Sequence, residues 1–353
     1  MSERPVLVIG GGPAGMEAAK GIAEIGYKAV LVEKRNVLGG TPELANYAAL
    51  TPDFRDAGEA MAEMAAAVDG DPNVEVVLGS TVTASAGSAG DFKVTVKNSR
   101  EARELDVGAV VIATGFQHFD PGRETQQYGY YEYDDVLTLV DLEKMLKAGK
   151  VVRPSNGEPP KRLCFIQCVG SRDRQIGNEY CSKVCCGVAA KQSIEVRKLV
   201  SDCKVFIFYI DMRMYGYWEP EIYWPSQEEY KVNYVKGIAT DIRQKNGRLL
   251  VRGEDTTMGR PMEVPMDMVV LSVGMEPSAG TREMAKVFGA KQNKYNFIET
   301  IDGALNTVST TVPGVFACGA AVGPADIEDS ISSAAAAAMK ACAVVRKASM
   351  AAG

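Results

Sequence analysis

The stretch RPVLVIGGGPAGMEAAKGIAEIGYKAVLVEK, residues 4–34, predicts the fold of the start of the chain. A short apolar run is followed by clustered glycines, and apolar residues then recur at helical spacing until a second apolar run ends at Glu33. This order is typical of a β-strand, a tight turn, an α-helix and a parallel second strand. The fold class that we predict is therefore α/β.

The glycines of this stretch have the spacing of a dinucleotide site. Gly10, Gly12 and Gly15 fill the G-x-G-x-x-G positions, which suit a tight turn, the approach of a pyrophosphate and helix-on-strand contact. The helix would then present free amides and a positive dipole end to the phosphates. Glu33, 18 residues after Gly15, is placed to accept hydrogen bonds from a ribose. A purely steric glycine turn is the alternative.

Composition narrows the class of protein further. The 353 residues are 46% hydrophobic and 24% charged, which favours a compact protein of one large or two dinucleotide-sized domains. A net charge of −6 without a basic stripe argues against nucleic-acid binding. No export signal is apparent, and the Ala-rich run from Ser330 carries Lys340, so we expect a cytoplasmic protein without membrane insertion. Eight cysteines then indicate reduced thiols for metal or redox work, and the single histidine, His118, excludes a His-rich metal or haem site.

A second strand–helix–strand pattern begins at Lys161. It consists of KRLCFIQ, a helix from Cys185 and a strand that ends at Asp211, and Asn246-Gly247 predicts a later hairpin turn. The first turn of this unit, residues 168–184, has only two glycines, and neither has the phosphate spacing, so no NAD motif is present. We predict two Rossmann-like domains, with residues 1–155 and 281–353 forming the first, discontinuous one and residues 156–280 inserted.

Four cysteines near this turn are candidate metal ligands. Two sets of four are possible. One is Cys164, Cys168, Cys181 and Cys185, which form two C-x3-C pairs, and the other is Cys168, Cys181, Cys185 and Cys186. In a strand, Cys164 and Cys168 would lie about 13 Å apart, so we expect Cys164 to face the core. The remaining C-x12-C-x3-C-C pattern is unlike zinc knuckles and suits an iron–sulfur cluster. We expect the nearby Arg172, Arg174 and Lys183 to offset the negative charge of such a cluster. Inert buried thiols and a reactive dithiol are the alternatives, although the chain contains no C-x2-C.

Three further segments resemble the flavoproteins of the glutathione reductase and thioredoxin reductase type. They are VLGG at residues 37–40, VGAVVIATG at 107–115 and TTVPGVFACGA at 310–320. The resemblance implies FAD, because in that family such segments wrap this cofactor. One departure is Ala320, which stands where the family usually has an aspartate. The residues expected to contact FAD are Gly10, Gly12, Pro13, Ala14, Gly15, Glu33, Lys34, Gly39, Gly40, Thr41, Val82, Ala113, Thr114, Gly115, Cys318, Gly319 and Ala320.

A closer resemblance, across nearly the whole chain, is to the A-type flavin subunit of heterodisulfide reductase. It is carried by FIQCVGSRD at 165–173, YCSKVCC at 180–186, DMRMYG at 211–216 and GAAVGPADIEDSISSAAAAA at 319–338. It implies a [4Fe-4S] cluster on Cys168, Cys181, Cys185 and Cys186 beside FAD. It also implies that a flavin-end segment contacts the ring; its residues are Gly323, Pro324, Asp326 and Ile327.

The ferredoxin-type cysteine runs of the long methanogen subunit are missing, so the chain resembles the short bacterial form. That form implies an electron-transfer subunit of a heterodisulfide-reductase-like complex in sulfur oxidation, with B and C type partner subunits and a homodimeric state. The alternatives are the flavin subunit of a quinone-interacting complex of sulfate reducers, a stand-alone NAD(P)H-dependent disulfide or ferredoxin reductase, and a scaffold that binds FAD and zinc. No side chain is predicted to be a catalytic acid or base.

Overall fold

The computed structural model describes residues 4–123 and 127–352, and the chain forms two compact units. The first comprises the residues up to Leu44, Glu59–Gln117 and the residues from Glu276 onward; the second comprises Ala45–Gly58 and His118–Met275. The expected two-domain α/β fold with a discontinuous first domain is confirmed. The predicted domain limits at 155 and 281 stay a prediction. The corresponding boundaries between the compact units lie between residues 117 and 118 and between residues 275 and 276.

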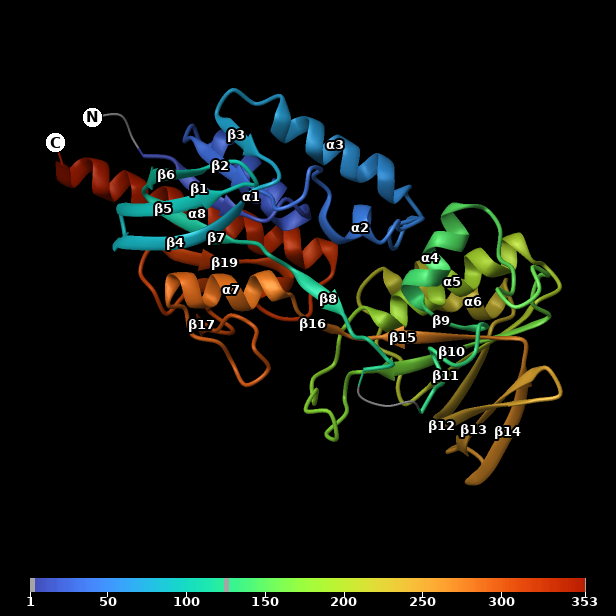
Figure 1. Ribbon diagram of the computed structural model, residues 1–353. Coiled ribbons are helices and arrows are strands. Elements are labelled where there is room, and N and C mark those ends of the chain that lie inside the picture. Colours follow the sequence, from blue (N-terminus) through green and yellow to red (C-terminus); the bar gives the residue numbers. More distant parts are fainter. Residues whose placement is uncertain (1–3, 124–126, 353) are drawn as a thin grey trace. The chain divides into compact units, whose positions relative to one another are not determined.

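The first unit is built on a seven-stranded sheet in the order β17-β18-β19-β7-β1-β2-β3 (Figure 1). The five strands from β19 to β3 are parallel, and β17 and β18 are antiparallel additions. The strands are β1 (Val6–Ile9), β2 (Ala29–Val32), β3 (Val74–Val77), β7 (Ala109–Ile112), β17 (Thr300–Asp302), β18 (Asn306–Thr310) and β19 (Val315–Ala317).

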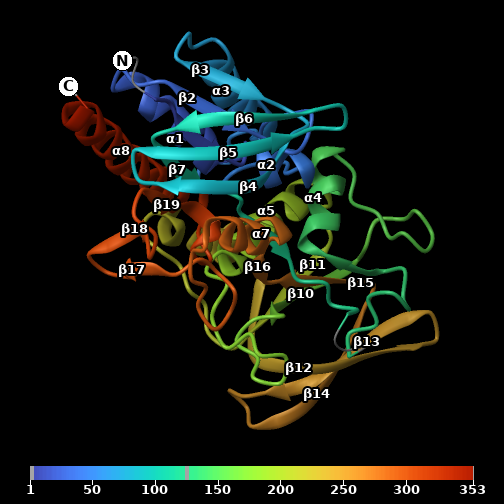
Figure 2. The same ribbon diagram turned by 60° about the vertical axis from the view of Figure 1, so that its left-hand side comes forward.

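Helices and a small sheet cover the two faces of this sheet. Helices α1 (Pro13–Glu24) and α8 (Ile327–Ala352) pack against each other and against β1 and β7. The antiparallel strands β4 (Thr81–Ser88), β5 (Asp91–Lys97) and β6 (Ala102–Val107) share a hydrophobic core with alternate residues of β1, β2 and β7 (Figure 2). The other helices of this region are α2 (Gly40–Leu44), α3 (Ala57–Asp69), α7 (Ala279–Phe288) and the 3-10 turn η2 (Gly319–Ala321).

The second unit has a sheet in the order β14-β13-β12-β11-β10-β15-β9. Its strands are β9 (Val136–Thr138), β10 (Arg162–Val169), β11 (Lys204–Tyr209), β12 (Asn233–Lys245), β13 (Arg248–Asp255), β14 (Arg260–Met266) and β15 (Met268–Val273). Helices α4 (Leu139–Lys147) and α5 (Cys185–Leu199) pack on one face, and β12 to β14 share a core with the other. The π-helix η1 (Glu219–Tyr223) leads into α6 (Trp224–Glu228), and β8 (Phe116–His118) pairs with β16 (Met275–Pro277).

The pattern of the sequence anticipated most of these elements. The hairpin at Asn246 and Gly247 is confirmed, because Lys245 pairs with Arg248 and both turn residues have positive φ. The Ala-rich run is a packed helix, and no helix within the described residues is both long and apolar enough to cross a bilayer. Cys164 is completely buried in the core, as its place on β10 predicts.

Helix α4 supplies a test of local stability. Its N-cap Thr138 accepts a hydrogen bond from the backbone of Asp141, whose carboxylate in turn accepts from the backbone of Thr138. Thr138→Ala removes the cap, so we expect the free energy of unfolding to fall by about 1 kcal/mol. Denaturant titration measures the change. Thr257→Ala, in an exposed turn of the same unit, is the control; an equal loss in both variants would contradict the role of the cap.

Candidate functional site

The turn between β1 and α1 has no room for a side chain at several of its glycines. A Cβ on Gly15 would lie 1.7 Å from the carbonyl oxygen of Gly10, and one on Gly10 would lie 2.4 Å from that of Ala113. Gly10 has φ of 110°, which L side chains rarely adopt. Helix α1 begins at Pro13 after Gly12, and no side chain caps it. Its first amides are therefore available to an anionic ligand.

The segment after β2 returns to this turn. The carboxylate of Glu33 is buried and accepts hydrogen bonds from the backbone amides of Gly11, at 2.6 Å, and Arg35, at 2.9 Å. The amide of Gly39 donates to the carbonyl of Gly11 at 2.8 Å, and a Cβ on Gly40 would lie 2.6 Å from the Cα of Gly12. Lys34 and Thr41 belong to the same segment. The glycines thus form a backbone cradle that fits a pyrophosphate, whereas the ribose role of Glu33 stays a prediction.

Two later segments lie at the same end of the sheet. Thr114 follows β7, and its hydroxyl is 2.8 Å from that of Thr281, which also donates to the carbonyl of Gly115 at 2.9 Å. After β19, a Cβ on Gly319 would lie 2.8 Å from the Cβ of Ala14, which places this turn against the start of α1. Four separated segments of the unit therefore surround one helix end, as a long dinucleotide requires.

The remaining predicted flavin contacts are differently placed. The side chain of Val82 is buried in the hydrophobic core, so only its backbone could meet a cofactor. Asp326 precedes α8 and its carboxylate accepts from the amide of Asp329 at 2.7 Å, which makes it a helix cap. Cys318 and Ala320 are buried, and Gly323, Pro324 and Ile327 are partly exposed. Their contacts with FAD stay predictions.

In the second unit, a β-bulge positions the first candidate cysteine. Ile166 pairs with Leu271 and Val169 with Val273, so Gln167 and Cys168 of β10 oppose the single residue Ser272 of β15. Cys168 has φ of 64°. Regular alternation would place its side chain on the face of Cys164, away from α5. The bulge instead allows the Cys168 sulfur to approach α5.

The other three cysteines flank the start of α5. Cys185 and Cys186 are its first two residues, and the thiol of Cys185 is within hydrogen-bonding reach of the sulfurs of both Cys168 and Cys186. Cys181 precedes a left-handed residue, Lys183, whose amide donates to the Cys181 sulfur at 3.3 Å. The structure thus brings Cys168, Cys185 and Cys186 close together, and Cys181 lies four residues before Cys185 along the chain.

The surroundings of these thiols favour negative charge. A hydrogen bond from Cys185, followed by the Arg172 guanidinium 4.0 Å away, lowers the pKa of Cys168 to about 7. Hydrogen bonding from Cys185 also lowers the pKa of Cys186, whereas the same bonds raise the pKa of Cys185 itself. The charge of Cys181 raises the pKa of Arg213, which lies beside it. An all-thiolate group with arginines nearby fits a cluster of iron and sulfide.

No three His, Cys, Asp or Glu side chains within residues 4–123 and 127–352 are arranged around a single-ion site. Of the nearby cations that the sequence suggests, Arg174 has a side chain that is 92% exposed and lies 3.9 Å from Glu179. The ammonium of Lys183 lies over the ring of Tyr215 instead.

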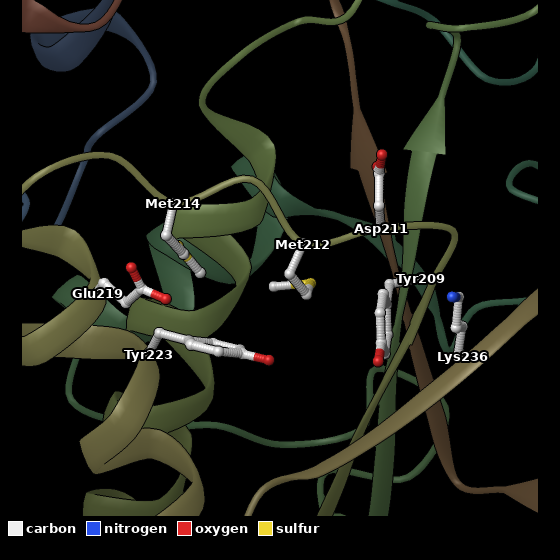
Figure 3. A pocket seen from close by; sticks show the side chains of 7 residues that line it. All are labelled: Tyr209, Asp211, Met212, Met214, Glu219, Tyr223 and Lys236. Carbon is white, nitrogen blue, oxygen red and sulfur yellow. The ribbon is translucent and has the colours of Figure 1, made fainter.

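A pocket of about 350 Å³ adjoins the cysteines on the side of the loop after β11. The Cys186 thiol is 3.9 Å from the carbonyl oxygen of Asp211, which is one of the lining residues. Figure 3 shows Met212 between the rings of Tyr209 and Tyr223, with the carboxylate of Asp211 turned away from them. That carboxylate pairs with Arg172 and Arg213. Sequence reasoning missed the π-helix that supplies Tyr223, because no single-residue signal marks such a turn.

A buried ionic group on α5 also escaped prediction. Lys191 is only 2% exposed, and its ammonium lies 2.7 Å from Glu143 and 3.2 Å from Glu195. It also donates to the carbonyl of Ala49 at 2.9 Å. A lysine in a helical pattern normally predicts a solvent-facing position, so this buried lysine could not be expected from the sequence.

The single histidine, His118, is also buried. Burial lowers its pKa to about 4, and its ring lies 3.2 Å from the hydroxyl of Tyr47.

Comparison with known proteins places this geometry in a class. Residues 4–153 match the family model described as pyridine nucleotide-disulphide oxidoreductase. Thioredoxin reductase from Lactococcus lactis has the same fold, with a TM-score of 0.66 and 20% identity over 98% of this chain and 99% of that one. For thioredoxin reductase from T. acidophilum the TM-score is 0.65 and the identity is 18%, over 96% of this chain and 98% of that one. The fold is therefore that of the two-domain Rossmann-type oxidoreductases.

Sequence relatives cover most of this chain. The A-type subunit of the H(2):CoB-CoM heterodisulfide,ferredoxin reductase of Methanothermobacter thermautotrophicus is 30% identical over 95% of this chain and 63% of its own length. The A-type subunit of the ferredoxin/F(420)H(2)-dependent CoB-CoM heterodisulfide reductase of Methanosarcina acetivorans is 32% identical over 96% of this chain and 53% of its own length. Over most of its length, the chain is a homologue of the A-type subunits of heterodisulfide reductases, as its motifs predict. It spans less than two thirds of the length of these relatives.

The glycine cradle supplies a test. Gly15→Val places a side chain against the Gly10 carbonyl, so we expect the purified variant to carry little or no flavin, while Gly303→Ala, where a Cβ meets no atom within 4 Å, keeps it. Flavin absorbance per chain measures the difference, and circular dichroism checks the folding of both variants. Full flavin content in a folded Gly15→Val variant would contradict the assignment of the cradle.

Proposed function

We propose that the chain is an electron-transfer subunit that binds FAD on its first unit and a [4Fe-4S] cluster on its second. The observation that carries the proposal is the contact among Cys168, Cys185 and Cys186 at the start of α5, in a homologue of the A-type subunits of heterodisulfide reductases. When bound, FAD exchanges electrons in pairs and the cluster exchanges them singly.

The residues of the chain would position these groups and set their charge balance. The glycines at 10, 12 and 15 and the amides of α1 would hold the pyrophosphate, with Glu33 near the ribose. Cys168, Cys181, Cys185 and Cys186 would hold the cluster, and Arg172 and Arg213 would offset its negative charge. Ala320 leaves the flavin end without the carboxylate that the sequence pattern would otherwise supply.

The wider setting that we propose is a heterodisulfide-reductase-like complex of dissimilatory sulfur oxidation in the cytoplasm. In it the chain would form a homodimer and pass electrons to B and C type subunits. A quinone-interacting complex of sulfate reducers is the alternative setting. Tyr217, 77% exposed, and the half-exposed Tyr215 and Trp224 lie on the aromatic segment 215–234, which suits a subunit contact. Limited proteolysis of the free chain and of the complex would test this surface.

The ligand assignment predicts contrasting cysteine variants. Cys186→Ala removes a cluster ligand, so we expect the iron content to fall well below the roughly four atoms per chain of a [4Fe-4S] cluster. Cys164→Ala changes a thiol in the core and should keep full iron. Iron and sulfide counts on anaerobically purified protein measure both. Equal iron in the two variants would show that the ligand set is wrong, and one zinc per chain would favour the scaffold.

A stand-alone NAD(P)H reductase is the second candidate, because the fold is that of thioredoxin reductases. Helix α5 begins with Cys185 and Cys186 instead of a glycine turn, and Val184 before it has no capping side chain. We therefore expect NADH or NADPH alone not to bleach the flavin absorbance of the oxidised protein rapidly. Stopped-flow absorbance measures this, with dithionite as the positive control. Fast bleaching by either nucleotide would support the reductase.

A further inference from the structure

Three buried polar side chains near the candidate cluster lack hydrogen-bond partners. They are Gln167, through both atoms of its amide, Ser171 and Ser272, through their hydroxyls. These residues supply four of the seven side-chain atoms found in that condition within residues 4–123 and 127–352. A buried polar group without a partner costs about 1–3 kcal/mol, so such a concentration requires an explanation.

The sheet geometry places two of them on the face that α5 covers. Along β10, Leu163 and Phe165 pack in the core beneath α4 and α5, and Gln167 continues the same alternation. Along β15, Met268 and Val270 pack in that core, and Ser272 continues their alternation. Each therefore stands at the carboxyl end of its strand.

The bulge brings these groups to the first candidate ligand. Gln167 and Cys168 together oppose Ser272 across the pair of strands. The third group, Ser171, lies in the turn just after β10, where its own amide donates to the carbonyl of Cys168 at 3.2 Å. A Cβ on Gly274, two residues after Ser272, would lie 3.1 Å from the Cβ of Ser171. The three residues thus lie next to Cys168, either along the chain or across the pair of strands.

We propose that Gln167, Ser171 and Ser272 donate hydrogen bonds to the sulfur atoms of the bound cluster and thereby raise its reduction potential. The inference rests on the proposed function. Their amide and hydroxyl groups offer four donor hydrogens, while thiolates and sulfides offer only acceptors. Donors that face sulfur stabilise the reduced cluster, which carries one more negative charge, and so they are positioning residues that tune potential.

The proposal predicts effects of opposite sign with and without the cluster. In the protein with its cluster bound, Gln167→Leu should lower the midpoint potential of the cluster. A shift of about 59 mV corresponds to a tenfold change in the equilibrium constant of this one-electron couple. Ser171→Ala and Ser272→Ala should lower it less. In the metal-free protein, the same three changes remove a buried unpaired group, so the melting temperature should rise or stay level.

The matched control is Ser193→Ala on α5. The hydroxyl of Ser193 is also buried, but it donates to the carbonyl of Ala190 at 2.6 Å. This change should leave the potential unaltered and lower the melting temperature of the metal-free protein. Gln167→Glu keeps the size of the side chain, and Ser272→Thr keeps the hydroxyl. The threonine variant should have the potential of the unsubstituted protein, and the glutamate variant, which loses the amide donor, should have a lower one.

The measurements are a redox titration followed by electron paramagnetic resonance and iron counts on each variant. Lower potentials at full iron in the three donor variants would support the proposal. Unchanged potentials at full iron in all three would overturn it and leave the proposed function standing. A wild-type protein that never takes up iron would overturn the proposed function itself.

Discussion

Both units of the chain depend on one constraint, which is that a helix must begin at the carboxyl end of a central parallel strand. Such a helix end has unpaired amides and a positive dipole end, and these must be satisfied by a cap, a ligand or water. At α1 the helix is preceded by a turn of glycines, in which the Gly10 carbonyl lies so close to Gly15 that no side chain fits there. At α5, Cys185 and Cys186 are the first residues of the helix, and no glycine turn precedes it.

Local rules were enough to predict much of the fold from the sequence. Apolar runs, glycine spacing and the Asn246-Gly247 pair anticipated both crossover units, the discontinuous first domain and the hairpin between β12 and β13. The burial of Cys164 could be predicted from its place in the apolar strand, about 13 Å from Cys168. The class of protein could be predicted as well, because close backbone approaches leave a glycine signature that composition alone does not produce.

The features that could not be predicted depend on contacts between distant segments. The bulge at Gln167 and Cys168 requires knowledge of which strand lies beside β10, and nothing local marks it. Residues 45–58 belong to the second unit because Ala48 and Ala49 bond to Glu143 and Lys191, which lie far along the chain. Arg174 looked like a cluster cation because it is near in sequence, whereas the more distant Arg213 contacts Cys181.

The charges around α5 show how a thiol-rich site can be held in a fixed geometry. Near the first turn of α5, the carboxylate of Asp211 pairs with Arg172 and Arg213. Each of these arginines also approaches a cysteine. Its carboxylate restrains the two guanidinium groups, so their positive charge stays near the sulfurs. Further along α5, Lys191 is buried between two carboxylates, an arrangement in which loss of one partner typically costs about 3–5 kcal/mol. Helix α5 is thus fixed at both places by charge pairs.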